Sequence, residues 1–283
     1  MSSFLVSKQD VKNFVNVPTL YKQQGIYFTY STPPEIISKI IPPPLEPVAP
    51  VVVGYIAQFG GTSFGGPYIE SLICTPCKYK NDVGGYSYNL MLFGHGAESG
   101  TIVGSNCCGI PKKTADGMEV NRIGDCVTAK ILRHGVTLVD LEIKLGHYNS
   151  SLASAYLGDP APGSVNTGCN FFHTFNMIQT ENGNSVFSDV FLVKLVTQAK
   201  CLNWEPGELN ITMRSSADDP FGELAVIQPI GGAFFENEYI EMTKTVKLAE
   251  LNADETMPYL MSGRYDRSMM GCPSTYLSGY YHR

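Results

Sequence analysis

Apolar and polar side chains alternate along residues 136–145, where the apolar set is Val139, Leu141, Ile143 and Leu145. A period of two residues is typical of a β-strand with one buried and one solvated face. β-rich runs bounded by turn residues recur at 51–59, 67–73, 86–93, 117–122, 125–132, 171–179, 186–197, 209–213 and 239–251. The pattern predicts a meander of mostly antiparallel strands.

The period changes to that of a helix only at 32–41. Thr32 can cap this segment and Glu35 can complete a capping box. One face then carries Ile36, Ile37, Ile40 and Ile41, and three prolines follow at 42–44. The chain is therefore predicted to contain few and short helices. Residues 158–168, with two prolines and three glycines, are predicted to form a connecting loop or a lid.

Composition sharpens this picture. Of 283 residues, 43% are hydrophobic and only 16% charged, which favours an extensive core, and 28 glycines with 18 prolines suit many turns. We predict a β-dominated α+β fold, a barrel or two packed sheets, in a single domain over 1–283. The first ~20 and last ~30 residues are expected to be peripheral to it. A net charge of −6 makes nucleic acid an unlikely class of partner.

The cellular setting is predicted from what the sequence lacks. Residues 1–8 contain no apolar stretch typical of a signal peptide, and no apolar run reaches the ~20 residues that span a bilayer. We expect a cytoplasmic protein that does not bind membranes, with reduced cysteines. Cys74 and Cys77 have the spacing of a redox motif or half a zinc site, but no second pair follows. Two ordinary buried thiols are favoured.

The candidate chemistry lies in Gly109-Ile110-Pro111-Lys112-Lys113. A pair of lysines is commonly a solvated turn. The alternative is that one amine is neutral and nucleophilic. The pKa of a lysine is about 10.4 in water, and burial or a neighbouring ammonium lowers it. A neutral amine adds to a ketone and forms an imine.

Several motifs together resemble the acetoacetate decarboxylase family. They are Ile-Pro-Pro-Pro-Leu-Glu-Pro at 41–47, Gly-Pro-Tyr-Ile-Glu at 66–70, Glu98, the lysine motif at 109–113, Trp-Glu-Pro-Gly at 204–207 and Asp-Pro-Phe-Gly-Glu-Leu-Ala-Val at 219–226. The resemblance covers residues 21–233. It implies a cone or double β-barrel of mostly antiparallel strands that forms homo-oligomers. It also implies chemistry that needs no metal and no organic cofactor.

The resemblance assigns roles by position. Lys112 matches the Schiff-base lysine, Lys113 its cationic neighbour and Glu70 the active-site carboxylate. Tyr68 and Glu98, from the matching motifs, are expected to bind substrate. Adjacent residues on a strand point to opposite faces, so Lys113 need not touch Lys112, and burial can be the larger cause of activation.

The sequence departs from the family pattern at charged positions. Tyr55 stands where the family has a second glutamate, and Gln23 stands near its arginine. The Gly-Arg-Glu before the lysines is Gly-Ser-Asn at 104–106. Tyr55 is expected to orient the substrate oxygen or act as an acid, and Gln23 to bind substrate through neutral hydrogen bonds.

These residues favour an enzyme that works through an imine on Lys112. The first hypothesis is a carbon–carbon lyase of secondary metabolism that decarboxylates a β-keto acid or a polyketide-like small molecule, with weak activity on acetoacetate. The second is an aldolase, dehydratase or cyclase that uses the same lysine on a keto substrate. The third is a non-catalytic small-molecule binding protein that keeps only the pocket.

Overall fold

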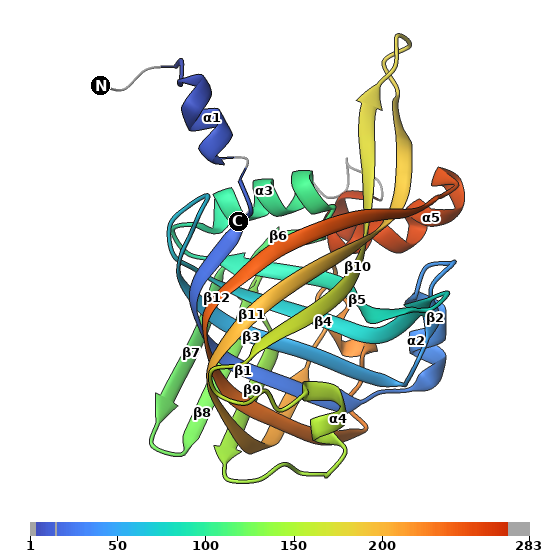
Figure 1. Ribbon diagram of the computed structural model, residues 1–283. Helices are drawn as coiled ribbons and strands as arrows, with labels where there is room; N and C mark the ends of the chain where they lie inside the picture. Colours follow the sequence, from blue (N-terminus) through green and yellow to red (C-terminus); the bar gives the residue numbers. More distant parts are fainter. Residues whose placement is uncertain (1–3, 15, 271–283) are drawn as a thin grey trace.

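The computed structural model describes residues 4–14 and 16–270, and one 12-stranded sheet dominates it (Figure 1). The strands are β1 (Thr19–Ser31), β2 (Glu46–Pro47), β3 (Val51–Thr62), β4 (Tyr68–Tyr79), β5 (Asp82–Phe93), β6 (Lys112–Thr114), β7 (Gly117–Ile123), β8 (Cys126–Arg133), β9 (Val136–Leu145), β10 (Val165–Gln179), β11 (Ser185–Met213) and β12 (Gln228–Glu250). The α-helices are α1 (Lys8–Phe14), α2 (Pro34–Ile40), α3 (Ala97–Cys108), α4 (Ala153–Leu157) and α5 (Ala253–Leu260). The predicted β-dominated fold is confirmed.

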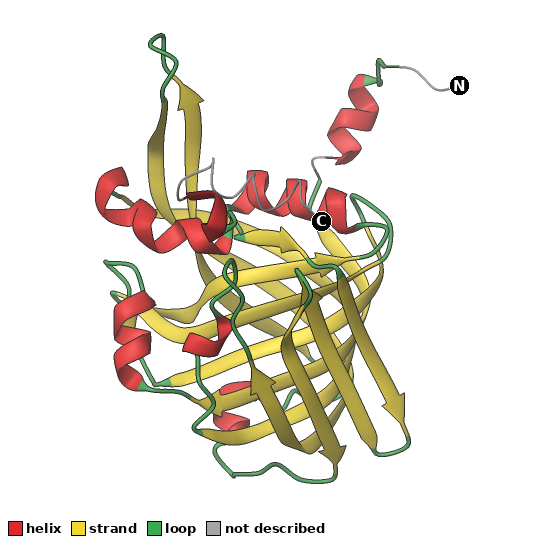
Figure 2. Ribbon diagram, turned by 180° about the vertical axis from the view of Figure 1, so that it is seen from behind, coloured by secondary structure: helices red, strands yellow, loops and turns green. Residues whose placement is uncertain are grey.

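Strand pairing closes part of the sheet on itself. The order β10-β5-β4-β3-β1-β12-β11 returns to its start because β10 also pairs with β11. We call these seven strands the ring. The long β11 then leaves the ring and pairs with β9, which continues through β8 to β7. Seen from behind, the sheet is strongly curled, and most helices gather at its upper end (Figure 2).

Successive residues on each ring strand pack into two different cores, as the period of two requires. On β3, Ile56 belongs to the larger core, which also contains apolar residues of β8 and β9. Its neighbours Tyr55 and Ala57 belong to a second core with Leu90, Phe172 and other ring residues. The second core fills the inside of the ring, and the candidate site lies among its residues.

The helix predicted over 32–41 is observed as α2, and its isoleucine face is confirmed. Ile37 and Ile41 are buried, and Ile36 and Ile40 pack against the larger core. The predicted cap is wrong. Pro33 occupies the N-cap position without a side-chain hydrogen bond, and the Thr32 hydroxyl is buried without a partner among the described residues.

The two ends of the chain differ from each other. The side chains of α1 are all exposed, and this helix projects from the body (Figure 1). In the C-terminal region that the sequence predicts to be peripheral, α5 and the turns after it pack on the body and form hydrogen bonds with it. Residues 271–283, which contain much of the tyrosine- and methionine-rich tail, lie outside the described residues. Across the described residues, no helix is long and apolar enough to cross a membrane.

Candidate active site

Lys112 opens β6, the short strand that follows α3. Gly109 ends the helix in the left-handed conformation, with φ 65°, and Pro111 leads into the strand. β6 runs parallel to β5 with Lys112 opposite Leu90, a residue of the inner core. Register therefore turns the Lys112 side chain toward the inside of the ring. Only 5% of the residue is exposed.

Glu70 on β4 and Tyr55 on β3 reach Lys112 across the intervening strand β5. Glu70 on β4 lies opposite Ala57 of β3, so it shares a face with Tyr55. Lys112 Nζ lies 2.9 Å from Glu70 Oε2 and donates to it, and the Tyr55 hydroxyl donates to Glu70 Oε1 at 2.6 Å. Glu70 is 4% exposed and Tyr55 9%. The three groups form a continuous buried chain of amine, carboxylate and phenol, which we call the triad.

The phenol of this triad is held in its protonated form. Burial raises the pKa of Tyr55 well above its ordinary value, and the negative charge of Glu70 adds to the effect. The same two causes, in the same order, raise the pKa of Tyr68, which lies two residues before Glu70 on the same face. The Tyr55 phenol is therefore a donor to Glu70, and the buried Tyr68 hydroxyl, which has no hydrogen-bond partner among the described residues, is a further donor inside the ring.

Helix α3 covers the amine at very short range. A Cβ on Gly104 would lie 2.5 Å from Lys112 Cε and 2.9 Å from Nζ. One turn earlier, a Cβ on Gly100 would lie 2.8 Å from Leu92 and 3.3 Å from the Tyr68 ring. The absence of side chains at these two positions lets the helix backbone form the wall of the site. This helix was not predicted from the sequence, because its glycines disfavour a helix in isolation.

Gln23 also lies on the inner face. It sits opposite Phe59 on β3 and Asn237 on β12, and it is 1% exposed. Its Oε1 accepts from Asn237 Nδ2 at 2.8 Å, while its Nε2 is buried without a partner among the described residues. Gln23 therefore offers one free donor inside the ring. The role of Asn237 was not predicted from the sequence.

Lys113 points away from the triad. Its Nζ donates to Asp219 Oδ1 at 2.9 Å and to the Asp218 carbonyl at 3.0 Å, and it lies 3.5 Å from Asp266 Oδ1. Arg133 bridges the same two carboxylates at 2.6 and 2.8 Å. The expectation that Lys113 acts beside Lys112 does not fit this geometry. Its buried charge is part of a structural network on the opposite face of the strand.

Glu98 is not brought into the site either. It lies in the first turn of α3 and is exposed to solvent. The helix presents its glycines, not this carboxylate, to the triad. Of the predicted residues, Lys112, Glu70, Tyr55, Tyr68 and Gln23 therefore share the interior of the ring, while Lys113 and Glu98 face elsewhere.

The contacts of two further groups, the cysteine pair at 74 and 77 and a cluster around His134, indicate structural roles. Cys74 and Cys77 are both free and buried, and burial raises the pKa of Cys74 to about 12, so these are protonated apolar side chains. The side chains of His134, Asp218 and Asp266 offer ligand atoms within 4.8 Å of one another. Lys113 and Arg133 already pair with the Asp266 carboxylate, and Lys113 also donates to the Asp218 backbone carbonyl, so their positive charges oppose a metal ion there.

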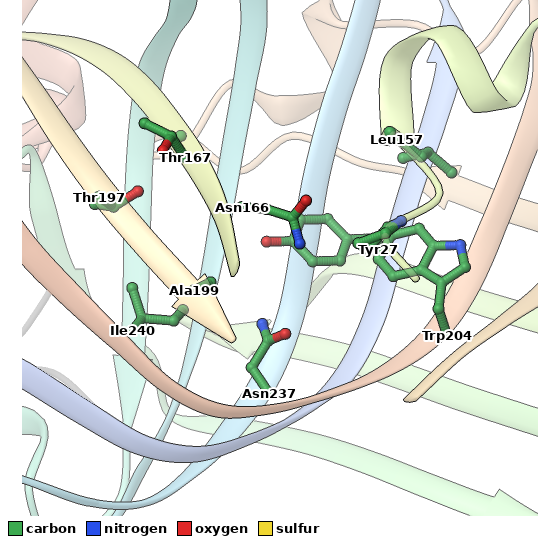
Figure 3. A pocket seen from close by; sticks show the side chains of 12 residues that line it. Tyr27, Leu157, Asn166, Thr167, Thr197, Ala199, Trp204, Asn237 and Ile240 are labelled. Carbon is green, nitrogen blue, oxygen red and sulfur yellow. The ribbon is translucent and has the colours of Figure 1, made fainter. Parts of the chain in front are cut away.

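A cavity of about 360 Å³ is lined by residues of the ring and of α4 (Figure 3). Tyr27 forms part of its wall and also packs edge-on against Tyr55, with ring centroids 5.5 Å apart. Trp204 also packs against Tyr27, with ring centroids 5.5 Å apart. In the sequence, Trp204 is recognisable only as part of the Trp-Glu-Pro-Gly motif, and Tyr27 was not predicted as a site residue.

Comparison with known proteins gives consistent results. The family model for acetoacetate decarboxylase matches residues 6–251. The CLA biosynthesis isomerase of Lactiplantibacillus plantarum is 42% identical over 270 residues, which cover 95% of this chain and 96% of that protein. Acetoacetate decarboxylase 1 of Bradyrhizobium diazoefficiens is 30% identical over 95 residues, covering 34% of this chain and 37% of that protein.

Solved structures share the fold at low sequence identity. Acetoacetate decarboxylase of Legionella pneumophila aligns with a TM-score of 0.70 at 15% identity, over 88% of this chain and 99% of that one. The enduracididine biosynthesis enzyme MppR, complexed with the condensation product of pyruvate and imidazole 4-carboxaldehyde, aligns with a TM-score of 0.65 at 15% identity. It covers 88% of this chain and 97% of that one.

Proposed function

The chain belongs to the acetoacetate decarboxylase family, and we propose that it is an isomerase of that family, which moves a carbon–carbon double bond into conjugation with a ketone through an imine on Lys112. The observation that carries this proposal is the buried chain of Lys112, Glu70 and Tyr55. It supplies a nucleophilic amine, a base and an acid within hydrogen-bond distance of one another. The 42% identity with an isomerase over nearly the whole chain favours this use of the three groups.

The proposed reaction needs no group beyond these three. The Lys112 amine gives one proton to Glu70 and adds to the ketone carbon to form a carbinolamine, whose nitrogen proton moves to its oxygen. The protonated Glu70 then gives its proton to the carbinolamine hydroxyl, which leaves as water, so that a protonated imine and the Glu70 carboxylate remain. Glu70, as a carboxylate, removes a proton from the carbon between the imine and the double bond, and the electrons form a dienamine. The same proton returns to the far carbon of the former double bond. Water then hydrolyses the conjugated imine to the product ketone and free Lys112.

The electrostatics favour this proton shift over loss of carbon dioxide. Within the described residues, Glu70 forms an ion pair with Lys112 and with no other cation. Gln23 and Tyr55 are neutral, so the site offers a substrate carboxylate no fixed positive partner. The proton shift moves no charge out of the pocket, because Glu70 takes up and returns the same proton. The charges of the site therefore favour isomerisation over the decarboxylation that the sequence predicts.

Decarboxylation of a β-keto acid is the second candidate, since it is the activity named for other family members. It would use the same imine as the electron acceptor.

Assembly into a homo-oligomer and a cytoplasmic location stay predictions from the sequence and the family resemblance.

A two-substrate assay separates the candidates. The protein is incubated with a β,γ-unsaturated ketone and, separately, with the matching β-keto acid. Conjugated enone is followed by its ultraviolet absorbance, and carbon dioxide by its release. We expect enone formation that disappears in Lys112→Met, and a borohydride-trapped adduct on the Lys112 peptide.

The other results would each overturn the proposal. Carbon dioxide release without enone formation would assign the decarboxylase function. Binding of both compounds with neither product would assign a binding protein. Enone formation that persists in Lys112→Met would exclude the imine and leave Glu70 as a base acting on the free ketone.

A further inference from the structure

The cavity beside Tyr27 has a wall without charge. None of the 12 lining residues is an Asp, Glu, Lys, Arg or His. The polar members are amides and hydroxyls, among them Asn166, Thr197 and Asn237, and the rest are aromatic, aliphatic or glycine. A mostly apolar cavity with a few neutral hydrogen-bonding groups is typical of a site for an uncharged organic group.

Two side-chain contacts link the cavity lining to the inner face that carries the triad. Tyr27 lines the cavity and packs on Tyr55, whose hydroxyl bonds Glu70. Asn237 also lines the cavity and bonds Gln23, whose Nε2 is a buried donor without a partner. The triad itself is nearly closed to solvent, whereas the cavity is partly open and is lined on one side by Leu157 of α4, a helix at the opposite end of the sheet from α3 (Figure 1). Tyr27 therefore lies between this cavity and the Tyr55 ring of the triad.

The outer rim of the cavity is fixed by a second set of bonds. Trp204 Nε1 donates to the Tyr148 hydroxyl at 2.9 Å and to Asp159 Oδ1 at 3.2 Å. Ser154 of α4 donates to Asp159 Oδ2 at 2.6 Å, which ties the helix to the same carboxylate. These bonds hold the Trp204 ring against Tyr27. They also place a negative charge at the rim, where it disfavours an anionic substrate group.

We propose that this cavity is the access route and the tail subsite of the Lys112 site, and that it selects ketones whose non-reacting end is uncharged. The inference rests on the proposed imine chemistry, because it places the reacting ketone at Lys112 and the tail beyond Tyr27. The rim charge and the neutral lining act together in this selection.

The test uses β-diketones, which form a strongly absorbing enaminone with a neutral lysine amine. Acetylacetone has no tail, benzoylacetone has an uncharged aromatic tail, and acetylpyruvate has a carboxylate. The variant Ala199→Trp fills the cavity, since Ala199 lines it on β11 (Figure 3). Gln198→Trp is the matched control, because Gln198 is the adjacent residue and is exposed.

We expect Ala199→Trp to slow benzoylacetone labelling of Lys112 by about tenfold or more while acetylacetone labelling changes little. Gln198→Trp should change neither rate. Tyr27→Ala should raise the ratio of the benzoylacetone rate to the acetylacetone rate, and acetylpyruvate should label the wild type more slowly than acetylacetone does. If Ala199→Trp does not fold, Thr197→Leu, which also fills the cavity, takes its place.

Two failures are distinguishable. If acetylacetone does not label Lys112 in the wild type, the imine proposal fails and the subsite proposal fails with it. If acetylacetone labels Lys112 but the cavity-filling variants leave the benzoylacetone rate unchanged, the imine stands and the cavity is not the tail subsite. Acetylpyruvate labelling as fast as acetylacetone would overturn the selection against charge.

Discussion

Gly104 lies against the proposed nucleophile, and its replacement by alanine tests whether α3 sets the position of that amine. Ordinary van der Waals contacts begin near 3.4 Å. The new Cβ would lie 2.5 Å from Lys112 Cε, which is about 0.9 Å too close. The other side of Lys112 is held by its 2.9 Å bond to Glu70. Either the lysine or the helix must therefore move by roughly that distance.

The expected loss of activity follows from this displacement. Shifting a reacting group by about 1 Å costs about 10²-fold in rate, which corresponds to about 2.7 kcal/mol of activation free energy. Stability should change in the opposite direction or little, because alanine is favoured over glycine within a helix by about 1 kcal/mol. Gly104→Ala is thus expected to inactivate the protein without unfolding it.

The assay measures acetylacetone labelling of Lys112 and the denaturant midpoint on the same preparations. Asn106→Ala is the control, because Asn106 is exposed on the same helix and its replacement also raises helix propensity. A Gly104→Ala protein labelled at the wild-type rate would refute the claim that α3 positions the amine. A loss of labelling that follows a large drop of the midpoint would assign the effect to helix stability instead.

Three further predictions concern the other buried groups. Tyr55→Phe removes the donor to Glu70 and should lower turnover by about 10²-fold. Burial and the charge of Glu70 hold the pKa of the phenol well above its usual range, so the pH–rate profile of the variant should keep the wild-type shape. Loss of an alkaline limb in the variant would contradict this. Lys113→Met leaves Asp219 with one cation fewer and should lower the free energy of unfolding by about 3 kcal/mol. The pH dependence of Lys112 labelling should stay unchanged. An unchanged denaturant midpoint would contradict the claim that the buried ion pairs of Lys113 stabilise the fold. Burial, with the charge of Arg264, lowers the pKa of His173 from 6.5 to about 3 in the native protein. Between these values the unfolded chain binds a proton that the native chain does not, so stability falls as pH falls, by up to about 1.4 kcal/mol per pH unit. His173→Phe should flatten this acid limb in denaturant titrations, and an equally steep limb would show that His173 does not cause it.

Much of the strand content could be predicted from the sequence alone. The alternation over 136–145 corresponds to β9 at the same residues, and the pattern over 117–122 corresponds to β7 within one residue. A period of two is a local property, because each strand needs one face toward a core whatever its neighbours are. The lysine motif and Glu70 were likewise recognisable as short stretches.

Segments without a clear period were missed or divided. The sequence did not indicate α3, since residues 97–108 contain two glycines, two serines and a β-branched run at 101–103 and have no apolar stripe. Its helical form depends on close packing through Gly100 and Gly104, which only the tertiary structure supplies. The single strand β11 was predicted as two separate runs, because its middle, with Pro206 and Gly207, has the composition of a turn.

The site itself was decided by strand register. Tyr55 and Glu70 are 15 residues apart and Glu70 and Lys112 are 42 apart, and neither spacing implies contact. They meet because β3, β4, β5 and β6 are neighbours and their register puts all three side chains on the inner face. Lys113 differs by one residue and therefore faces the other way, toward Asp219, 106 residues further along the chain. The sequence determined which residues could do the chemistry, and the pleat of the sheet determined which of two adjacent lysines is placed to do it.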